Sequence, residues 1–150
     1  MKNLTKHISK HILETNYIGH LGFISEDKPY VVPITYFYDS DENCILSYSA
    51  EGHKINAMRK NNAVSLEVSE IKSVNSWQSI LVHGKFEELG GTHAKQQLHK
   101  FALGIKKILL IKENKHHQLI SDFSSKITSN GVPIMYRIKL LDITGKCREY

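Results

Sequence analysis

The chain has 150 residues and a formal net charge of +5, because 20 lysines and arginines stand against 15 aspartates and glutamates. Hydrophobic residues make up 41% and charged residues 23%, which is typical of a soluble globular protein and excludes a disordered chain. No run of about 18 apolar residues occurs, and the polar start lacks the apolar segment of a signal peptide. The two cysteines, Cys44 and Cys147, are too few for a disulfide framework. We therefore expect one cytoplasmic domain over residues 1–150.

The first element is predicted from hydrophobic spacing. Leu4, Ile8 and Ile12 recur at every fourth residue, which predicts a short helix. After Asn16 the pattern changes to short runs of β-branched and aromatic residues separated by polar turns. We expect six antiparallel strands, at residues 18–25, 30–38, 44–49, 64–69, 76–89 and 134–143.

Two further segments interrupt these strands. Residues 51–62 predict one short helix after the third strand, and residues 92–125 are expected to be helical or irregular, with Phe101 and Ile105 on an apolar stripe. Short strands joined by turns favour closure of the sheet, which removes exposed edges. The predicted fold class is therefore mainly β, a six-stranded antiparallel split β-barrel with a helical insertion before the last strand.

The segment Tyr48–Ile55 is the first candidate site. A strand ends there, Gly52 allows a bend, and a helix begins with His53 and Lys54. A helix N-terminus presents unpaired backbone N–H groups and partial positive charge, so together with the Ser49 hydroxyl and Lys54 it could hold a phosphate. The alternative is that Ser49 caps the helix beside an exposed lysine.

The strand over residues 30–38 is the second candidate. Pro33 removes one donor from the ladder of hydrogen bonds, which predicts a sheet edge, a split or a bulge. Backbone groups left free beside it could bind a planar ligand. The alternative is that Pro33 only protects an edge strand from aggregation.

These stretches, in this order, resemble the pyridoxamine 5′-phosphate oxidase-like FMN-binding split barrels, and most closely their nitroimidazole-resistance-protein branch. The resemblance covers most of residues 18–90 and the last strand. The matching pieces are residues 22–24, 27–36, 48–54, 58–61, 64–68, 76–84 and 143–146.

The resemblance implies FMN as cofactor and assigns residues to it. Residues matching Val32, Pro33, Ile34 and Thr35 line the flavin ring in that family. Those matching Tyr48, Ser49, His53 and Lys54 hold the FMN phosphate. Trp77 and Ser79 match positions near the ring or at the dimer interface. Arg59 matches a basic family position. The family also implies a homodimer with FMN at the interface.

The sequence departs from the family pattern at two of these positions. Many relatives have histidine where Tyr48 stands, and arginine or lysine where His53 stands. A histidine changes its charge near neutral pH, so the affinity for phosphate is expected to depend on pH. Pyridoxamine phosphate oxidase itself binds the substrate phosphate with arginine and histidine residues near its C-terminus. Residues 145–148 match only part of that segment, so oxidation of pyridoxamine phosphate is not expected.

Other polar groups receive simpler interpretations. His7 and His11 lie four residues apart without a third ligand, so no metal site is expected there. The same holds for His116–His117. The lysine-rich segment 92–117 lacks arginine and has Phe101 as its only aromatic residue, so we interpret it as a solvated helix face rather than a nucleic-acid groove.

The leading hypothesis is therefore an FMN-binding protein that acts as a flavin-dependent oxidoreductase on an unidentified small molecule, with no single residue standing out as acid or base. The alternative is a non-catalytic flavin or haem carrier or sensor on the same fold. A basic nucleic-acid-binding module ranks last, and neither nucleic-acid nor membrane partners are expected.

Overall fold

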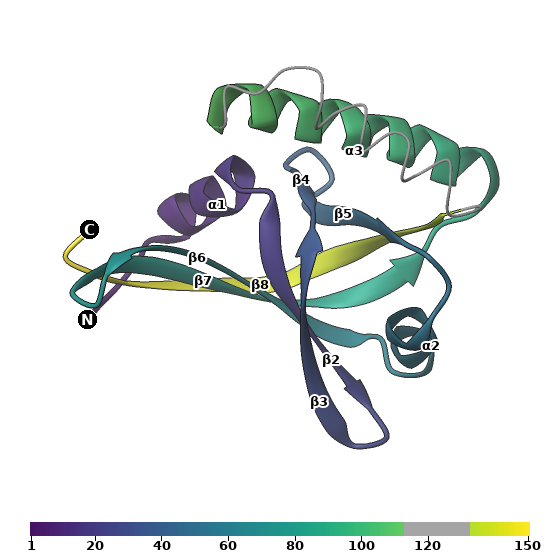
Figure 1. Cartoon of the computed structure of the whole chain (residues 1–150), viewed down its shortest axis with the longest axis horizontal. Helices are drawn as coiled ribbons and strands as arrows, with labels where there is room; N and C mark the ends of the chain where they lie inside the picture. Colours follow the sequence, from purple (N-terminus) through teal and green to yellow (C-terminus); the bar gives the residue numbers. More distant parts are fainter. Residues whose placement is uncertain (113–132) are drawn as a thin grey trace.

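The computed structural model describes residues 1–112 and 133–150. Within these residues eight strands form one antiparallel sheet, with three helices packed against it (Figure 1). The strands are β1 (Lys2–Asn3), β2 (Ile18–Ser25), β3 (Lys28–Thr35), β4 (Phe37–Asp39), β5 (Cys44–Ser49), β6 (Ala63–Ser73), β7 (Ser76–Glu88) and β8 (Ile134–Arg148). The helices are α1 (Lys6–Thr15), α2 (His53–Lys60) and α3 (Gly91–Lys112).

The sheet closes on itself through one stretch of chain. Its strand order is β3-β2-β6-β7-β8-β5-β4, so β3 and β4 stand at opposite ends of the order, yet only Tyr36 separates them in sequence. The Tyr36 N–H donates to the carbonyl of Tyr17 (2.8 Å), and the Ser47 hydroxyl donates to the carbonyl of Thr35 (2.7 Å). The predicted mainly β split barrel is thereby confirmed.

The predicted number of six strands was too low. The segment expected as one strand over residues 30–38 is divided at Tyr36, because its first half pairs with β2 and its second half with β5. The short strand β1, which pairs with β8, was not foreseen. The first two predicted strands left four residues, 26–29, between them, but the turn is shorter. Ser25 pairs with Lys28, and the two residues between them have positive φ, as in a two-residue hairpin turn.

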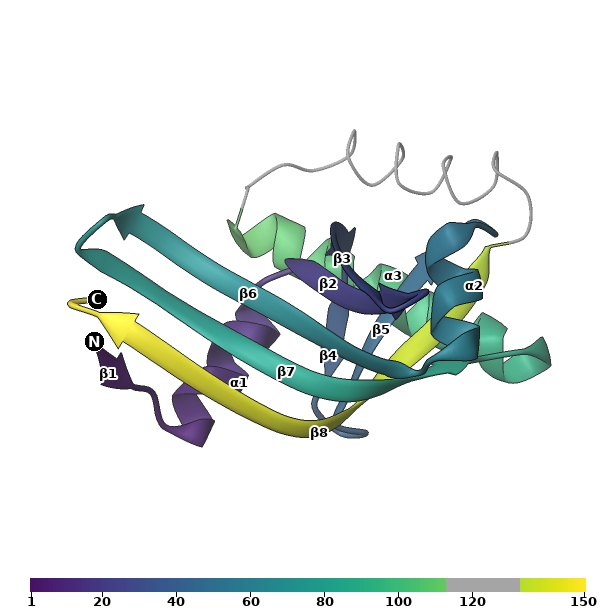
Figure 2. The same ribbon diagram turned by 90° about the horizontal axis from the view of Figure 1, so that it is seen from below.

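Alternate residues of the central strands fill the barrel. Val64, Leu66 and Val68 of β6 are buried, as are Ile80 and Val82 of β7, so these alternate positions face the core. The opposite face of β7 points away from this core. Figure 2 shows β6, β7 and β8 in front of α1 and α3, so neither of these helices covers that outer face.

Helix α1 closes part of the barrel, and its buried face keeps only part of the predicted stripe. Thr5 caps its N-terminus by accepting the N–H of Ile8 (3.2 Å), and the buried residues are Ser9, Ile12 and Leu13. Ile8 is 43% exposed, so its place in the predicted stripe was wrong. The helix begins only at Lys6, so Leu4 lies outside it and packs against the main core, while Ile12 is buried as predicted.

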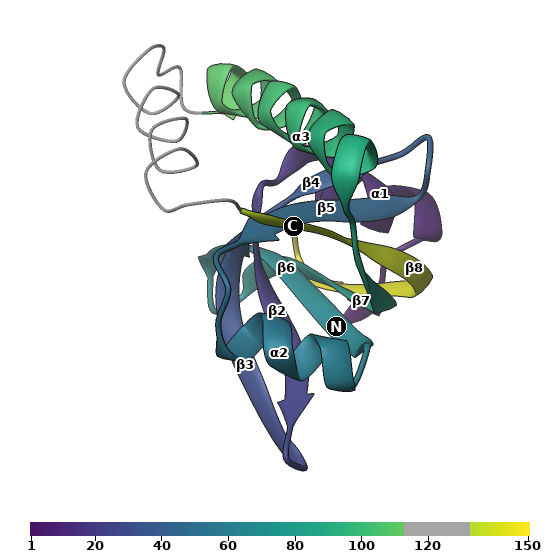
Figure 3. The same ribbon diagram turned by 90° about the vertical axis from the view of Figure 1, so that its right-hand side faces the viewer.

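Helix α3 covers β4 and β5 (Figure 3). Phe101, Ile105 and Leu109 form a second core cluster with Cys44 and Leu46. Burial raises the pKa of the Cys44 thiol to about 11, as expected for a small core residue. No helix in the described ranges is long and apolar enough to cross a membrane. His116–His117 and the predicted continuation to residue 125 lie outside the described residues.

The packing of α3 depends on Gly104, because a Cβ at this position would overlap the ring of Phe37. We expect Gly104→Ala to destabilise the fold by about 1–2 kcal/mol. Overpacking costs about 1–3 kcal/mol and outweighs the gain of about 1 kcal/mol in helix propensity. Urea unfolding measures the effect. Gly90→Ala is the matched control, since nothing lies within 4 Å of a Cβ there. Equal stability of both variants would show that α3 does not rest on Phe37 as described.

Candidate functional site

The predicted ring-binding residues lie on an edge strand. β3 pairs with β2 alone, and Pro33 stands opposite His20, which confirms the edge predicted from the proline. Ile34 is buried, Val32 and Thr35 are half-buried, and Pro33 is exposed. Along its other side β3 has no paired strand among the described residues, so its backbone groups are available to a ligand.

The end of β5 sends its side chains to two different faces. Tyr48 follows Cys44 and Leu46 on the face toward α3, where its ring contacts Phe101 edge-on, with 5.5 Å between centroids. Burial raises the pKa of Tyr48. Ser49 faces the other way by the alternation of a strand. The two residues that the sequence grouped together therefore do not share a face.

The helix cap by Ser49, which was the alternative interpretation of this segment, is not formed. Gly52 is the N-cap residue of α2, without a side-chain cap bond, and the Ser49 hydroxyl donates instead to the carbonyl of Ala50 (2.9 Å). The first N–H groups of α2 thus have no side-chain acceptor within the described residues. This arrangement excludes the capping alternative and leaves the anion-binding alternative for the segment.

Lys54 lies in the first turn of α2 and is half-buried. Burial lowers the pKa of its ammonium group, because removal of water disfavours the charged form. No carboxylate lies within ion-pair distance of Lys54 in residues 1–112 and 133–150. A partly desolvated cation of this kind gains from any anion that can approach it.

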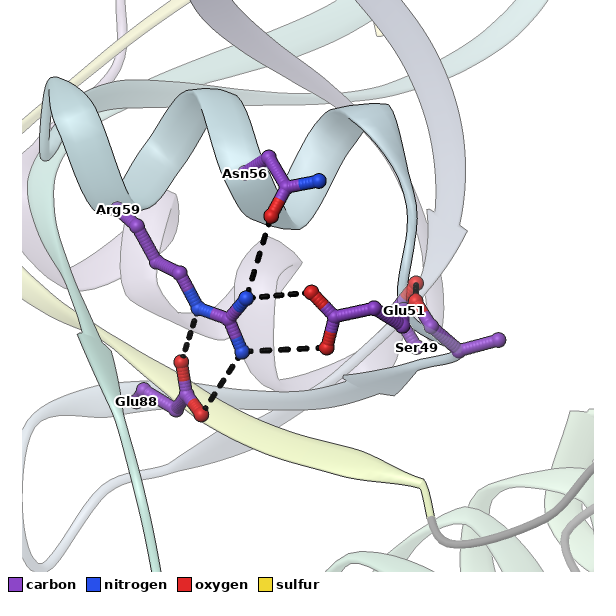
Figure 4. Close-up of polar contacts among 6 residues, drawn as sticks. Ser49, Glu51, Asn56, Arg59 and Glu88 are labelled. Atoms are coloured by element: carbon purple, nitrogen blue, oxygen red, sulfur yellow. Dashed lines mark hydrogen bonds and ion pairs between the residues drawn. The ribbon is translucent and has the colours of Figure 1, made fainter.

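Arg59, on the same helix, is held by two carboxylates (Figure 4). Its Nε and Nη2 donate to Glu88 (2.6 and 3.1 Å), and its Nη1 and Nη2 donate to Glu51. Nη1 also donates to Oδ1 of Asn56 (3.2 Å). The hydrogen bonds that Arg59 donates to Glu88 and Glu51 raise its pKa further. Arg59 is therefore neither simply solvated nor open to a phosphate.

His53 belongs to an aromatic group that sequence reasoning missed. Its ring lies edge-on to Tyr30 (5.0 Å between centroids) and to Phe23 (5.9 Å), and Nε2 is 3.0 Å from the Ser25 hydroxyl. Phe23 and Tyr30 are stacked on each other at 5.4 Å. The sequence contained a usable signal, because a two-residue turn after Ser25 places Phe23 directly opposite Tyr30.

Trp77 and Ser79 do not join this group within one chain. They lie on the outer face at the beginning of β7, where Trp77 pairs with Arg148. Arg59 of α2 contacts Glu88 at the other end of the same strand. Glu88 lies eleven positions after Trp77, or about 35 Å along an extended strand. The structure thus brings β3, the end of β5 and the start of α2 together, and leaves Trp77 and Ser79 apart.

Comparison with known proteins extends these observations. An uncharacterised protein of Rhizobium meliloti is 36% identical over 92 residues, which are 60% of this chain and 60% of the relative. Among solved structures, an FAD-binding protein of Mesorhizobium loti is 24% identical with a TM-score of 0.76, covering 99% of this chain and 97% of its own. An FAD and heme binding protein of Mycobacterium smegmatis is 12% identical with a TM-score of 0.73, covering 100% and 75%.

A third structure, of a candidate 5-nitroimidazole antibiotic resistance protein from Bacteroides thetaiotaomicron, has 20% identity and a TM-score of 0.68, covering 96% of this chain and 86% of its own. At these identities the three structures share the fold. The family model described as pyridoxamine 5′-phosphate oxidase matches residues 6–146, nearly the whole length. The chain therefore belongs to the pyridoxamine 5′-phosphate oxidase family.

Proposed function

We propose that this protein binds the FMN portion of a flavin and acts as a flavin-dependent oxidoreductase on a small molecule. The observation that carries the proposal is the half-buried ammonium of Lys54, which lacks a carboxylate partner within the described residues and stands in the first turn of α2. The family membership and the flavin-binding proteins of the same fold support flavin as the ligand.

The phosphate of FMN matches the charge requirement of this position. A phosphate dianion next to Lys54 offsets the cost of its burial and accepts hydrogen bonds from the first backbone N–H groups of α2. Arg59 contributes little to this binding, because Glu51 and Glu88 occupy its donors. The affinity for phosphate thus depends mainly on Lys54 and the helix terminus, with Ser49 and His53 beside them.

The isoalloxazine ring is assigned to the open edge of β3. The backbone groups of Val32–Thr35 that face away from β2 suit the polar edge of the ring, except that Pro33 has no N–H and the Thr35 carbonyl already accepts from Ser47. When bound, the flavin supplies the redox chemistry, while the protein orients its ring and sets the hydrogen bonds around it. None of the residues 32–35 carries an acid or a base, so their expected role is positioning.

A homodimer accounts for Trp77 and Ser79. Both lie on the outer face of β7 beside Leu81, which is 37% exposed, and a second copy packed on this face brings its Trp77 and Ser79 toward the site.

We expect Leu81→Asp to convert the dimer into a monomer and to weaken FMN binding, since a charge in an apolar interface must be desolvated. Size-exclusion chromatography with light scattering tests this. Leu103→Asp on α3 is the control, and a wild-type monomer would contradict the assignment.

The flavin proposal itself is tested by titrating the protein with FMN and with riboflavin, which lacks the phosphate. We expect FMN to bind at least about tenfold more tightly, because a charge-assisted hydrogen bond contributes about 1.5–3 kcal/mol. Equal affinities would exclude a phosphate contact at this site.

Turnover is tested by photoreducing the bound flavin without oxygen and adding small acceptors. Rapid reoxidation indicates an oxidoreductase, whereas a flavin that stays reduced and exchanges indicates a carrier.

A further inference from the structure

A cavity of about 500 Å³ lies between the turn that joins β2 to β3 and one face of α2. Helix residues three and four positions apart share a face, and His53, Asn56 and Lys60 line the cavity from α2 in this way. Tyr30 lines it from β3. Figure 3 shows α2 lying beside β2 and β3. The residues that line the cavity extend from His53 to Asn61, so the cavity runs along the length of the helix.

The cavity begins where the proposed phosphate site ends. His53 lines the cavity and directly precedes Lys54, whereas Asn61 lines the cavity at the other end of α2. The eight residues of the helix span about 12 Å at 1.5 Å per residue. A ligand whose phosphate meets the start of α2 can therefore continue along this face of the helix, provided that it extends beyond that phosphate.

An aromatic surface is available for stacking. The ring of Tyr30 is supported from behind by Phe23, almost parallel to it at 9°, and His53 contacts both rings edge-on. Tyr30 itself is 37% exposed. A ring held on one side and exposed on the other is the arrangement on which a planar base stacks.

The polar lining has donors and acceptors in separate places. Oδ1 of Asn56 already accepts from Arg59, and Oδ1 of Asn61 accepts from the backbone N–H of Ala63 (3.1 Å). Among residues 1–112 and 133–150 neither NH₂ group has an acceptor, so both are left for a ligand, and these donors match the ring nitrogens of a purine. On the turn, the carboxylates of residues 26 and 27 can accept from ribose hydroxyls.

We infer that this cavity binds the adenosine half of FAD, with the FMN half placed as proposed above, on which the inference rests. The aromatic ring of Tyr30, the amide donors and the acidic turn together match a nucleoside. The carboxylates also disfavour a ligand with a further phosphate on its ribose. The expected preference is therefore FAD over FMN.

The test measures the Kd of FAD and of FMN by quenching of flavin fluorescence. Tyr30→Ala removes the stacking ring, and Tyr30→Phe keeps it. Asn61→Asp retains the oxygen that accepts from Ala63 and replaces the NH₂ donor by an anion. We expect the wild type and Tyr30→Phe to bind FAD at least about tenfold more tightly than FMN. In Tyr30→Ala and Asn61→Asp this ratio should fall close to one, with the Kd of FMN nearly unchanged.

The inference would be overturned if the wild type bound FAD and FMN with nearly equal Kd values, or if Tyr30→Ala and Asn61→Asp both kept the wild-type preference for FAD. A separate titration with AMP tests the cavity without flavin. Saturable binding of AMP to the wild type but not to Asn61→Asp supports the nucleoside site even if neither flavin binds, in which case the proposed function fails alone. If the protein binds flavin but not AMP, and its Kd values for FMN and FAD are nearly equal, the proposed function stands and the adenosine site is excluded.

Discussion

Replacing Lys54 by methionine is expected to weaken FMN binding by about 10- to 150-fold while leaving the affinity for riboflavin nearly unchanged. The factor corresponds to about 1.5–3 kcal/mol for a charged hydrogen bond to phosphate. Methionine keeps an unbranched apolar side chain of similar length, so the packing of α2 is retained. Fluorescence titration with both ligands measures the change, and Lys106→Met, at an exposed position on α3, is the control.

The same substitution should raise the stability of the flavin-free protein. The pKa of Lys54 is lowered in the folded state by burial, so folding disfavours its charged form. A folded state that binds the proton less tightly than the unfolded state gains stability as the pH rises toward the ordinary lysine pKa of 10.5. Lys54→Met should abolish this alkaline gain. Lower affinity together with higher stability identifies a residue kept for binding, whereas an unchanged FMN-to-riboflavin ratio would exclude Lys54 from the phosphate site.

Loss of the Lys100 charge should have the largest effect on stability. Asp39 is only 2% exposed, and Nζ of Lys100 lies 2.5 Å from its Oδ2, while Oδ1 accepts the N–H of Asp41 (3.2 Å). Lys100→Met leaves a buried carboxylate without its cation, which costs about 3–5 kcal/mol in the protein interior. Because part of Lys100 is exposed, we expect about 2–4 kcal/mol.

Urea unfolding of Lys100→Met and of the double variant Asp39→Asn/Lys100→Met measures this interaction. The double variant should recover part of the loss, since it no longer buries an unpaired charge. The hydrogen bond to Asp39 raises the pKa of Lys100, so on the alkaline side the contribution of the Lys100 charge is complete up to the ordinary lysine pKa of 10.5 and is lost as the pH rises further. Wild-type stability of Lys100→Met at pH 7 would show that the pair does not hold α3 against β4.

Strands bounded by clear turn residues could be predicted from the sequence. β2 and β5 have the predicted limits, because polar turns flank them and their apolar residues favour extended backbone. The division at Tyr36 could not be predicted in this way. It arises from the change of pairing partner at that residue, and an exchange between two distant strands leaves no local trace in the sequence.

The candidate site was predicted in outline but not in its contacts. The order of strand, glycine and helix placed Lys54 correctly in the first turn of α2. The carboxylates that hold Arg59 come from positions 8 and 29 residues away, beyond the reach of helical spacing. The opposite faces of Tyr48 and Ser49, in contrast, follow from strand alternation and could have been deduced.

The visible absorption spectrum of the purified protein, recorded before and after incubation with flavin and removal of the excess, tests the central claim most directly. We predict the two-banded spectrum of a bound flavin, retained by the wild type and largely lost by Lys54→Met. A Soret band would indicate haem instead. A protein that stays colourless after incubation with both FMN and FAD would contradict the claim that the family fold holds a flavin in this chain.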